Sequence, residues 1–325
     1  MKILLVSALI LLALVFLALG VGSVDLTWRE IFSALFGDTN AKVNAVVLQI
    51  RLPRILLAIA VGGGLSVAGA VLQSILKNPL AEPYILGVSS GGTFGALVSM
   101  LLGFSFFFIQ LFSFVGSLIV IALILFLSNE KKVAFNHVGV LLAGVMIGAF
   151  FGAAILIVLT LTRENLQTAV FWLVGSLSFA EPSSSYYVFA FASALVFFLS
   201  LGGYKLNLIA MENAQGEISG VNIKVARLTF LAATGVLTGA LVSVSGVVGF
   251  IGMIVPHLVR NKFGFDNRAV VPISFFAGGA LLLIADTIAR TVILPAELPV
   301  GAITAFFGAP VFIWILKKKD YYFSI

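Results

Sequence analysis

The sequence predicts an all-α integral membrane protein, with ten transmembrane helices in a single domain that spans residues 1–325. Its composition is the first reason: 61% of residues are hydrophobic, 10% are charged and the mean hydropathy is +1.18. Soluble domains carry roughly 25% charged residues. The second reason is length, because apolar segments of about 20 residues, enough to cross a hydrocarbon core, recur along the whole chain.

Glycine, proline and charged residues separate these segments and set the predicted boundaries. The segment at 3–21 is predicted to be a retained first span and not a cleaved signal, because its apolar run is long and further spans follow. Residues 24–49, which include Trp28 and Phe32, predict an amphipathic segment at the membrane interface. The ten predicted spans are 3–21, 51–76, 85–103, 106–128, 138–161, 185–204, 226–245, 248–263, 269–289 and 300–316.

Ten spans place both termini on one side of the membrane. With that topology, 13 of the 19 lysines and arginines lie on the side of the termini, including the run at 317–319. The positive-inside rule therefore predicts cytoplasmic termini. The net charge of +6 follows from these loops and predicts no nucleic-acid partner.

The span at 51–76 differs from a lipid-facing anchor. Its middle, residues 61–70, is rich in glycine and alanine, and such small side chains let neighbouring helices approach closely. Arg51 and Arg54 stand at its outer start, and a turn with two prolines, residues 77–83, follows its inner end. This pattern predicts a helix at the centre of the bundle.

The outer arginines allow two interpretations. Arg51 and Arg54 lie three residues apart and share a helix face, while Arg290 follows Asp286 by four residues, the spacing of an ion pair. The arginines either extend to lipid headgroups or present fixed positive charge to the carboxylates of a soluble partner. Asp286 is predicted in the last outer turn, where water and Arg290 relieve the cost of a charge in the membrane.

The longest inner connection, about 207–222, predicts one or two short helices broken at Gly216 and Gly220. A loop that only joined two helices could be shorter, so it is either an inert surface loop or an element that couples to a motor protein. No Gly-x4-Gly-Lys-Ser/Thr motif occurs, so ATP would be hydrolysed on another subunit. With no cysteine and no cluster of metal-ligating residues in the sequence, we expect no enzyme activity, cofactor or metal site in this chain.

Several sequence blocks resemble the signature of the FecCD-type permeases, the membrane subunits of bacterial ABC importers for ferric siderophores, haem and vitamin B12. They begin with Arg51-Leu52-Pro53-Arg54 and Asn78-Pro79-Leu80-Ala81-Glu82-Pro83 and extend to about residue 316. The remaining blocks are 86–91, 249–252, 255–257, 266–268, 285–290, 297–301 and 308–312. The family's Asp-His-Arg reads Asp266-Asn267-Arg268 here, a mild departure that leaves the role of this loop plausible.

The resemblance implies the type II ABC importer architecture in the bacterial inner membrane. A homodimer would form the pathway along its axis, together with two cytoplasmic ATPase subunits and a periplasmic or lipid-anchored binding protein. ATP would drive alternating access. The cargo would be a metal chelate, with ferric siderophore the first candidate and haem or vitamin B12 the alternatives.

The resemblance also implies roles for particular residues. Docking of the binding protein is expected on Arg51, Arg54 and Arg290, and an inner gate at Asn78 and Leu80. The fifth and tenth spans would line the pathway, with His137, Thr304 and Phe307 as candidates, although the family's second gate has no counterpart at His137 and is not carried over. Contacts with the ATPase are expected from Glu212, Gln215, Glu217, Ser219, Gly220, Val221 and Asn222.

Two other functions stay open. A proton- or sodium-coupled transporter needs carboxylates at mid-membrane and broken helices; breaks are expected near Pro79 and Pro256, but no such carboxylate is expected. A channel or a purely structural subunit would leave the long inner connection unexplained.

Overall fold

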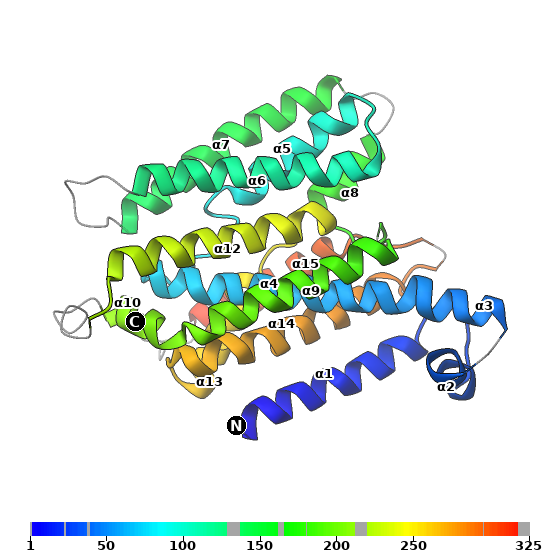
Figure 1. Ribbon diagram of the computed structural model, residues 1–325. Coiled ribbons are helices and arrows are strands. Elements are labelled where there is room, and N and C mark those ends of the chain that lie inside the picture. Colours follow the sequence, from blue (N-terminus) through cyan, green and yellow to red (C-terminus); the bar gives the residue numbers. More distant parts are fainter. Residues whose placement is uncertain are drawn as a thin grey trace.

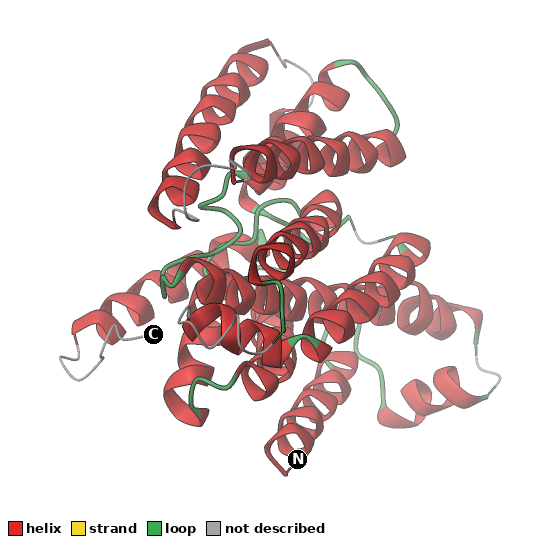
Figure 2. Cartoon of the chain, turned by 60° about the vertical axis from the view of Figure 1, so that its left-hand side comes forward, coloured by secondary structure: helices red, strands yellow, loops and turns green. Residues whose placement is uncertain are grey.

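The computed structural model describes residues 2–22, 24–37, 40–128, 137–161, 166–179, 181–211, 220–294 and 296–317, and the regular structure in these ranges is entirely helical (Figures 1 and 2). The helices are α1 (Lys2–Gly20), α2 (Trp28–Phe36), α3 (Ala41–Asn44), the π-helical η1 (Ala45–Arg51), α4 (Leu52–Leu76), α5 (Val88–Leu101), α6 (Phe106–Ser128), α7 (His137–Leu161), α8 (Leu166–Val174), α9 (Pro182–Leu201), α10 (Gly203–Met211), α12 (Ile223–Ser245), α13 (Ile251–Phe263), α14 (Asn267–Ala289) and α15 (Val300–Lys317).

Each of the ten predicted spans coincides with one of these helices. In the described ranges, seven helices are long and apolar enough to cross a membrane. The other three predicted spans correspond to α5, α13 and α15, and of these α5 and α13 have only 14 and 13 residues. Each of the two short helices follows a non-helical stretch, residues 77–87 before α5 and residues 246–250 before α13.

Helix α4 lies at the centre of the bundle, as its small residues predicted. It is almost completely buried, and α9, α12, α13 and α14 surround it (Figure 1). The helices approach so closely that a Cβ atom added to Gly62 would lie 2.3 Å from the carbonyl oxygen of Gly278 in α14. A Cβ added to Gly69 would lie 1.7 Å from the carbonyl oxygen of Gly252 in α13. Glycine at these positions is therefore a condition of the packing.

The helix that contains α4 begins earlier than predicted. It runs from Ala41 to Leu76 without a break, so residues 41–49 continue the same helix and do not form a separate segment. A break would be expected at Pro53, because proline lacks an N–H and crowds the carbonyl of the preceding turn. The π-helical turn η1 accommodates this defect, with the N–H of Leu52 bonded to the carbonyl of Val47, five residues back.

The remaining part of the predicted interfacial segment is helix α2. A capping box fixes its start, because the Glu30 carboxylate accepts a hydrogen bond of 2.8 Å from the backbone N–H of Thr27. Trp28 and Phe32 are each 48% exposed, while Ile31 and Ala34 are buried. This two-faced helix fits the predicted position at a membrane interface.

A proline does not mark the second helix break. We expected it near Pro256, but Pro256 lies inside α13, and the chain leaves helical geometry at residues 246–250. Pro256 has no N–H to offer the Gly252 carbonyl, four residues earlier, and that carbonyl faces α4 at Gly69. Phe250 ends the break with φ at 70°, a conformation that is costly for a bulky residue.

The two non-helical stretches, 77–87 and 246–250, contact one another. The backbone N–H of Val248 donates a hydrogen bond of 2.7 Å to the hydroxyl of Tyr84. Non-helical backbone inside a membrane protein is tolerated where protein surrounds it and its polar groups are paired. The contact therefore joins the chain after α4 to the chain before α13.

Candidate functional site

Helix α4 connects two polar clusters at opposite ends of the bundle. We call them the Arg54 end, where α1 ends, α4 begins and α14 ends, and the Asn78 end, where α4 ends and α14 begins. In Figure 1 the Arg54 end lies to the right, near α2 and α3, and the Asn78 end lies to the left, near α10. Helices α1 and α14 run from the Asn78 end toward the Arg54 end.

At the Arg54 end, Arg54 is held by two carboxylates. Its Nη2 and Nε atoms lie 2.9 and 3.0 Å from Oδ1 of Asp286, and its Nη1 atom lies 2.8 Å from Oε2 of Glu297. Asp286 is completely buried, whereas the Glu297 side chain is 37% exposed. This arrangement pairs a buried guanidinium with a buried carboxylate in bidentate geometry, the strongest form of the interaction.

The ion pair expected between Asp286 and Arg290 is present, but Arg54 is the closer partner of Asp286. The nearest approach between Arg290 and Asp286 is 3.9 Å, too long for a hydrogen bond, and burial leaves Asp286 no access to water. Arg290 instead donates from Nη2 to the carbonyl of Ala18 in α1, at 2.7 Å. Its Nε atom has no hydrogen-bond partner in the described part of the chain.

Arg51 completes the cluster. Its guanidinium donates to the carbonyls of Leu19 and Val24, and so ties the end of α1 to the start of α4. Arg51, Arg54 and Arg290 thus come together at one end of the bundle, at 3%, 8% and 8% exposure. Burial and internal hydrogen bonds do not favour the interpretation that they extend to headgroups. Their role in docking stays a prediction.

At the Asn78 end, the predicted gate residues form a tight turn after α4. Lys77 ends the helix with φ at 48°, and the side-chain oxygen of Asn78 accepts a hydrogen bond of 2.9 Å from the backbone N–H of Leu80. Asn78 is half-buried, and Leu80 is 37% exposed. The asparagine therefore stabilises the turn itself, and the gate stays a prediction.

Sequence reasoning did not identify Arg260, the buried cation beside this turn. It is 5% exposed, and its Nη2 atom contacts the Ala70 carbonyl, the Ser74 hydroxyl and the side-chain oxygen of Asn267 at 2.8, 2.8 and 3.1 Å. No carboxylate pairs with it in the described residues. The negative end of the α4 dipole, one turn away, offsets its charge. A lone arginine after a proline gives no signal of this contact in the sequence.

The same cluster reaches helix α10. The side chain of Asn207 donates to Asp266 and accepts from the backbone N–H of Asn267, both at 2.8 Å. Asp266 also pairs with Arg268 at 2.7 Å, and the hydrogen bonds from Arg268 hold the pKa of Asp266 well below its usual range. Asn267, where the family pattern has histidine, is buried and bonded to Ser74. Asn267 therefore has a structural role at the position where the family pattern has histidine.

Part of the predicted coupling region is described. Gly220 has φ at 67°, Val221 is half-buried, and the side chain of Asn222 caps α12 by accepting from the Val225 N–H at 3.1 Å. Four predicted coupling residues lie outside the described residues: Glu212, Gln215, Glu217 and Ser219. Helix α10 precedes them, so the Asn207 contacts connect this region to the start of α14.

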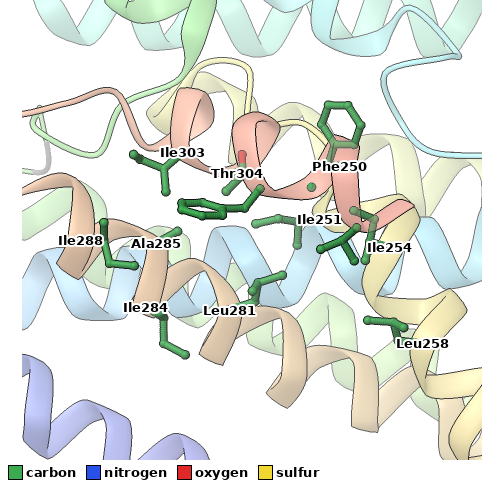
Figure 3. A pocket seen from close by; sticks show the side chains of 13 residues that line it. Phe250, Ile251, Ile254, Leu258, Leu281, Ile284, Ala285, Ile288, Ile303 and Thr304 are labelled. Atoms are coloured by element: carbon green, nitrogen blue, oxygen red, sulfur yellow. The ribbon is translucent and has the colours of Figure 1, made fainter. Parts of the chain in front are cut away.

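The predicted pathway residues Thr304 and Phe307 line a cavity of about 260 Å³ between α13, α14 and α15 (Figure 3). Its other walls are apolar and include Phe250, Ile254 and Leu281. The Thr304 hydroxyl is bonded to the carbonyl of Gly301 in its own helix, at 3.0 Å. The third candidate, His137, is the first residue of α7 and lies outside this cavity. The pathway assignment stays a prediction.

Long apolar helices with charge gathered at their two ends define a multi-pass membrane protein. The sequence matches the FecCD transport family over residues 10–318, so the chain belongs to that family. It is 38% identical to the hemin transport system permease protein HmuU of Yersinia pestis, with 95% of this chain and 94% of the relative covered. It is 31% identical to the iron(3+)-hydroxamate import system permease protein FhuG of Bacillus subtilis, with 97% and 96% covered.

A solved structure has the same fold. A metal-chelate type ABC transporter in an inward-facing conformation superposes with a TM-score of 0.87 at 29% identity, over 98% of this chain and 99% of that one. The predicted family and the predicted all-α permease architecture are therefore confirmed. The chain is a membrane permease of the ABC importer class.

Proposed function

We propose that this chain is the membrane-spanning subunit of a binding-protein-dependent ABC importer, which moves a bulky iron chelate into the cytoplasm by ATP-driven alternating access. In this proposal the Arg54 end faces outward and receives the loaded binding protein. The Asn78 end faces the cytoplasm, together with both termini, and contacts two separate ATPase subunits. The membrane is the bacterial inner membrane.

The observation that carries the proposal is the placement of α4. One buried helix has the arginine cluster at its start and the Asn78 turn at its end, and Asn78 follows Arg54 by 24 residues. Beside that turn, Asn207 of α10 and Arg260 of α13 are bonded to the same few residues. Motion of the coupling region can therefore reach the turn through direct contacts.

We propose a homodimer, with the pathway between the two copies. Helix α15 supports this, because Phe306, Ile313 and Trp314 are 74%, 65% and 58% exposed on one short helix beside the cavity. The cavity of about 260 Å³ is small for a metal chelate. A second copy facing α15 would enlarge the enclosed space and supply the missing wall.

Ferric siderophore is the proposed cargo, and haem or vitamin B12 are the alternatives. Relatives named for hemin and for iron(3+)-hydroxamate support a chelate but do not choose between them. The purified cognate binding protein, mixed with each candidate in turn, is expected to retain a ferric chelate through gel filtration and to show its visible absorption band. Retention of haem or cobalamin alone would reassign the cargo.

A gradient-driven transporter is the rival function. It needs a carboxylate that binds and releases a proton or sodium ion inside the membrane. Glu82, beside the backbone of Phe250, has one carboxylate oxygen with no hydrogen-bond partner in the described residues, so it is the carboxylate on which the rival function would depend. Asp286, by contrast, is bonded to Arg54 in bidentate geometry. A carboxylate fixed by a buried arginine is poorly suited to that cycle. Co-purification of the chain with a soluble ATPase would support the importer over this rival.

Arg290→Gln tests the docking face. Among the three arginines, Arg290 has the guanidinium with the fewest internal partners, and glutamine keeps a polar side chain while removing the charge. We expect its loss to weaken binding of the loaded binding protein by about tenfold or more, since an interfacial charge loses its partner. The measurement is the dissociation constant on permease–ATPase complexes in nanodiscs.

The matched control is Arg29→Gln, which removes an exposed positive charge from α2 at the same end. It is expected to change the dissociation constant by less than about threefold, the size of a peripheral electrostatic effect. Equal losses in the two variants would show a general charge effect and contradict docking on the arginine cluster.

A further inference from the structure

The exposed member of the Arg54 cluster is an acid. Arg51, Arg54 and Arg290 are 3%, 8% and 8% exposed, whereas the Glu297 side chain is 37% exposed. A partner whose surface is acidic therefore meets a carboxylate first and finds the arginines covered. Like charges placed against each other at an interface oppose binding. Docking on the arginines in this conformation requires that Glu297 change its position.

Glu297 is held by two hydrogen bonds. Its Oε2 atom accepts from Nη1 of Arg54 at 2.8 Å and from the hydroxyl of Ser178 at 2.6 Å. Burial acts to raise the pKa of Glu297, but the bond from Ser178 and the charge of Arg54 outweigh it, and the pKa lies below its ordinary value. The carboxylate is therefore ionised and joins α4 to the connection between α8 and α9.

Glu297 also stands three residues before α15. The backbone between them is bonded on both sides: the N–H of Leu298 donates to the Ala289 carbonyl at 3.0 Å, and the N–H of Gly301 donates to the Gly175 carbonyl at 3.1 Å. A Cβ added to Gly301 would lie 1.8 Å from the Val174 carbonyl oxygen, so the first turn of α15 packs directly on the end of α8. Glu297 is therefore connected to the start of α15 by a short backbone segment that is hydrogen-bonded to α14 on one side and to the chain after α8 on the other.

Helix α15 forms one wall of the cavity, and Thr304 and Phe307 lie on that wall. Glu297 thus lies between the arginine cluster and a wall of the proposed pathway. If Glu297 leaves Arg54, the charge of Arg54 is still neutralised, because the buried Asp286 stays bonded to it in bidentate geometry. The half-exposed Glu297 can turn into water once its two hydrogen bonds break, one of them charge-assisted, whereas the completely buried Asp286 cannot.

We propose that Glu297 holds the place of a partner carboxylate on Arg54, and that docking of an acidic binding protein exchanges the two carboxylates and releases the start of α15. The inference rests on the proposed docking function. It assigns to Glu297 the role of a latch between the docking face and the pathway helix. Ser178 positions this latch.

Glu297→Gln tests the exchange, because glutamine keeps the size of the side chain and removes the competing charge. Affinity for the loaded binding protein is expected to rise by about tenfold, the effect of one charge-assisted hydrogen bond that no longer has to be displaced. Ser178→Ala, which leaves the charge unchanged and removes one of the two bonds, is expected to give a smaller rise of about threefold. Dissociation constants are measured on the assembled permease–ATPase complex in nanodiscs.

The matched control is Glu181→Gln, since Glu181 is an exposed carboxylate just before α9 at the same end. An equal rise in affinity for Glu181→Gln and Glu297→Gln would show a general effect of surface charge and overturn the proposal. Unchanged or weaker binding by Glu297→Gln would overturn it as well. If Arg290→Gln binds normally, docking on the cluster fails; if Arg290→Gln weakens binding but Glu297→Gln does not strengthen it, only the latch fails.

Release of α15 has its own readout. The sequence has no cysteine, so Ala302→Cys in the first turn of α15 and the exposed Tyr187→Cys on α9 can carry a pair of spin labels, both outside the residues assigned to the contact between copies. Docking is expected to shift or broaden the distance distribution, and Glu297→Gln is expected to show part of that change without the binding protein. Identical distributions in all of these samples would contradict the coupling of Glu297 to α15.

Discussion

Arg54→Ala is expected to lower the free energy of unfolding by about 3–5 kcal/mol, the cost of leaving a buried charge without its partner. The variant strands Asp286, which is completely buried and has Arg54 as its hydrogen-bonded partner at 2.9–3.1 Å. Arg290, whose Nε atom lies 3.9 Å from Oδ2 of Asp286, forms an ion pair with it but no hydrogen bond, so the hydrogen bonds of Arg54 are lost in the variant. The measurement is the unfolding transition of the purified chain in detergent, followed by near-ultraviolet circular dichroism.

Arg268→Ala is the matched control. It removes another arginine that binds an aspartate in bidentate geometry, at 2.7–3.1 Å, but those side chains are 67% and 43% exposed. An exposed pair contributes about 0–1 kcal/mol, so the two variants are expected to differ widely. The double variant Arg54→Met/Asp286→Leu should recover most of the loss, because an apolar pair of similar volume removes both charges. Equal losses for Arg54→Ala and Arg268→Ala would contradict the buried pair.

Gly69→Ala is expected to destabilise the bundle by about 3 kcal/mol, the upper part of the range for overpacking a core. Its Cβ would lie 1.7 Å from the Gly252 carbonyl oxygen, far inside van der Waals contact. The obstacle is backbone and not a flexible side chain, so α13 itself would have to move away from α4. The expected result is a lower unfolding temperature and a smaller yield of monodisperse protein.

Gly152→Ala separates this effect from helix propensity. Gly152 lies in α7, where an added Cβ has no atom within 4 Å, and alanine is favoured over glycine in a helix by up to about 1 kcal/mol. The control is therefore expected to be neutral or slightly stabilising. A similar loss in both variants would mean that α4 and α13 are not packed backbone to backbone.

Most of the helical architecture could be predicted from the sequence. Hydropathy and length locate spans well when each span is a single long helix, as for α6 and α14. The central position of α4 followed from its small residues, because close helix contacts require them. Two predictions were wrong for a shared reason: the start of the α4 helix at residue 51 and a helix break near Pro256. Whether a proline interrupts a helix depends on how the neighbouring backbone accommodates it in three dimensions.

The candidate site was less predictable. Spacing along one helix correctly suggested an ion pair between Asp286 and Arg290, but it gave no sign of the hydrogen-bonded partner Arg54, 232 residues away in the sequence. Arg260 and Glu297 gave no local signal, since each is a single charge whose contacts come from other helices. Sequence resemblance pointed to Arg51, Arg54 and Arg290 as a group, and the fold shows that they are neighbours without testing what they bind.

The central claim is that this permease moves a chelate with energy from ATP hydrolysed on a partner subunit. The most direct measurement is uptake of radioactive ferric siderophore into proteoliposomes that contain the permease–ATPase complex, with the cognate binding protein outside and ATP on the ATPase side. The predicted result is uptake that requires both ATP and the binding protein and is unaffected by collapse of the ion gradients. Uptake that persists without ATP and stops when a proton or sodium gradient is collapsed would contradict the account.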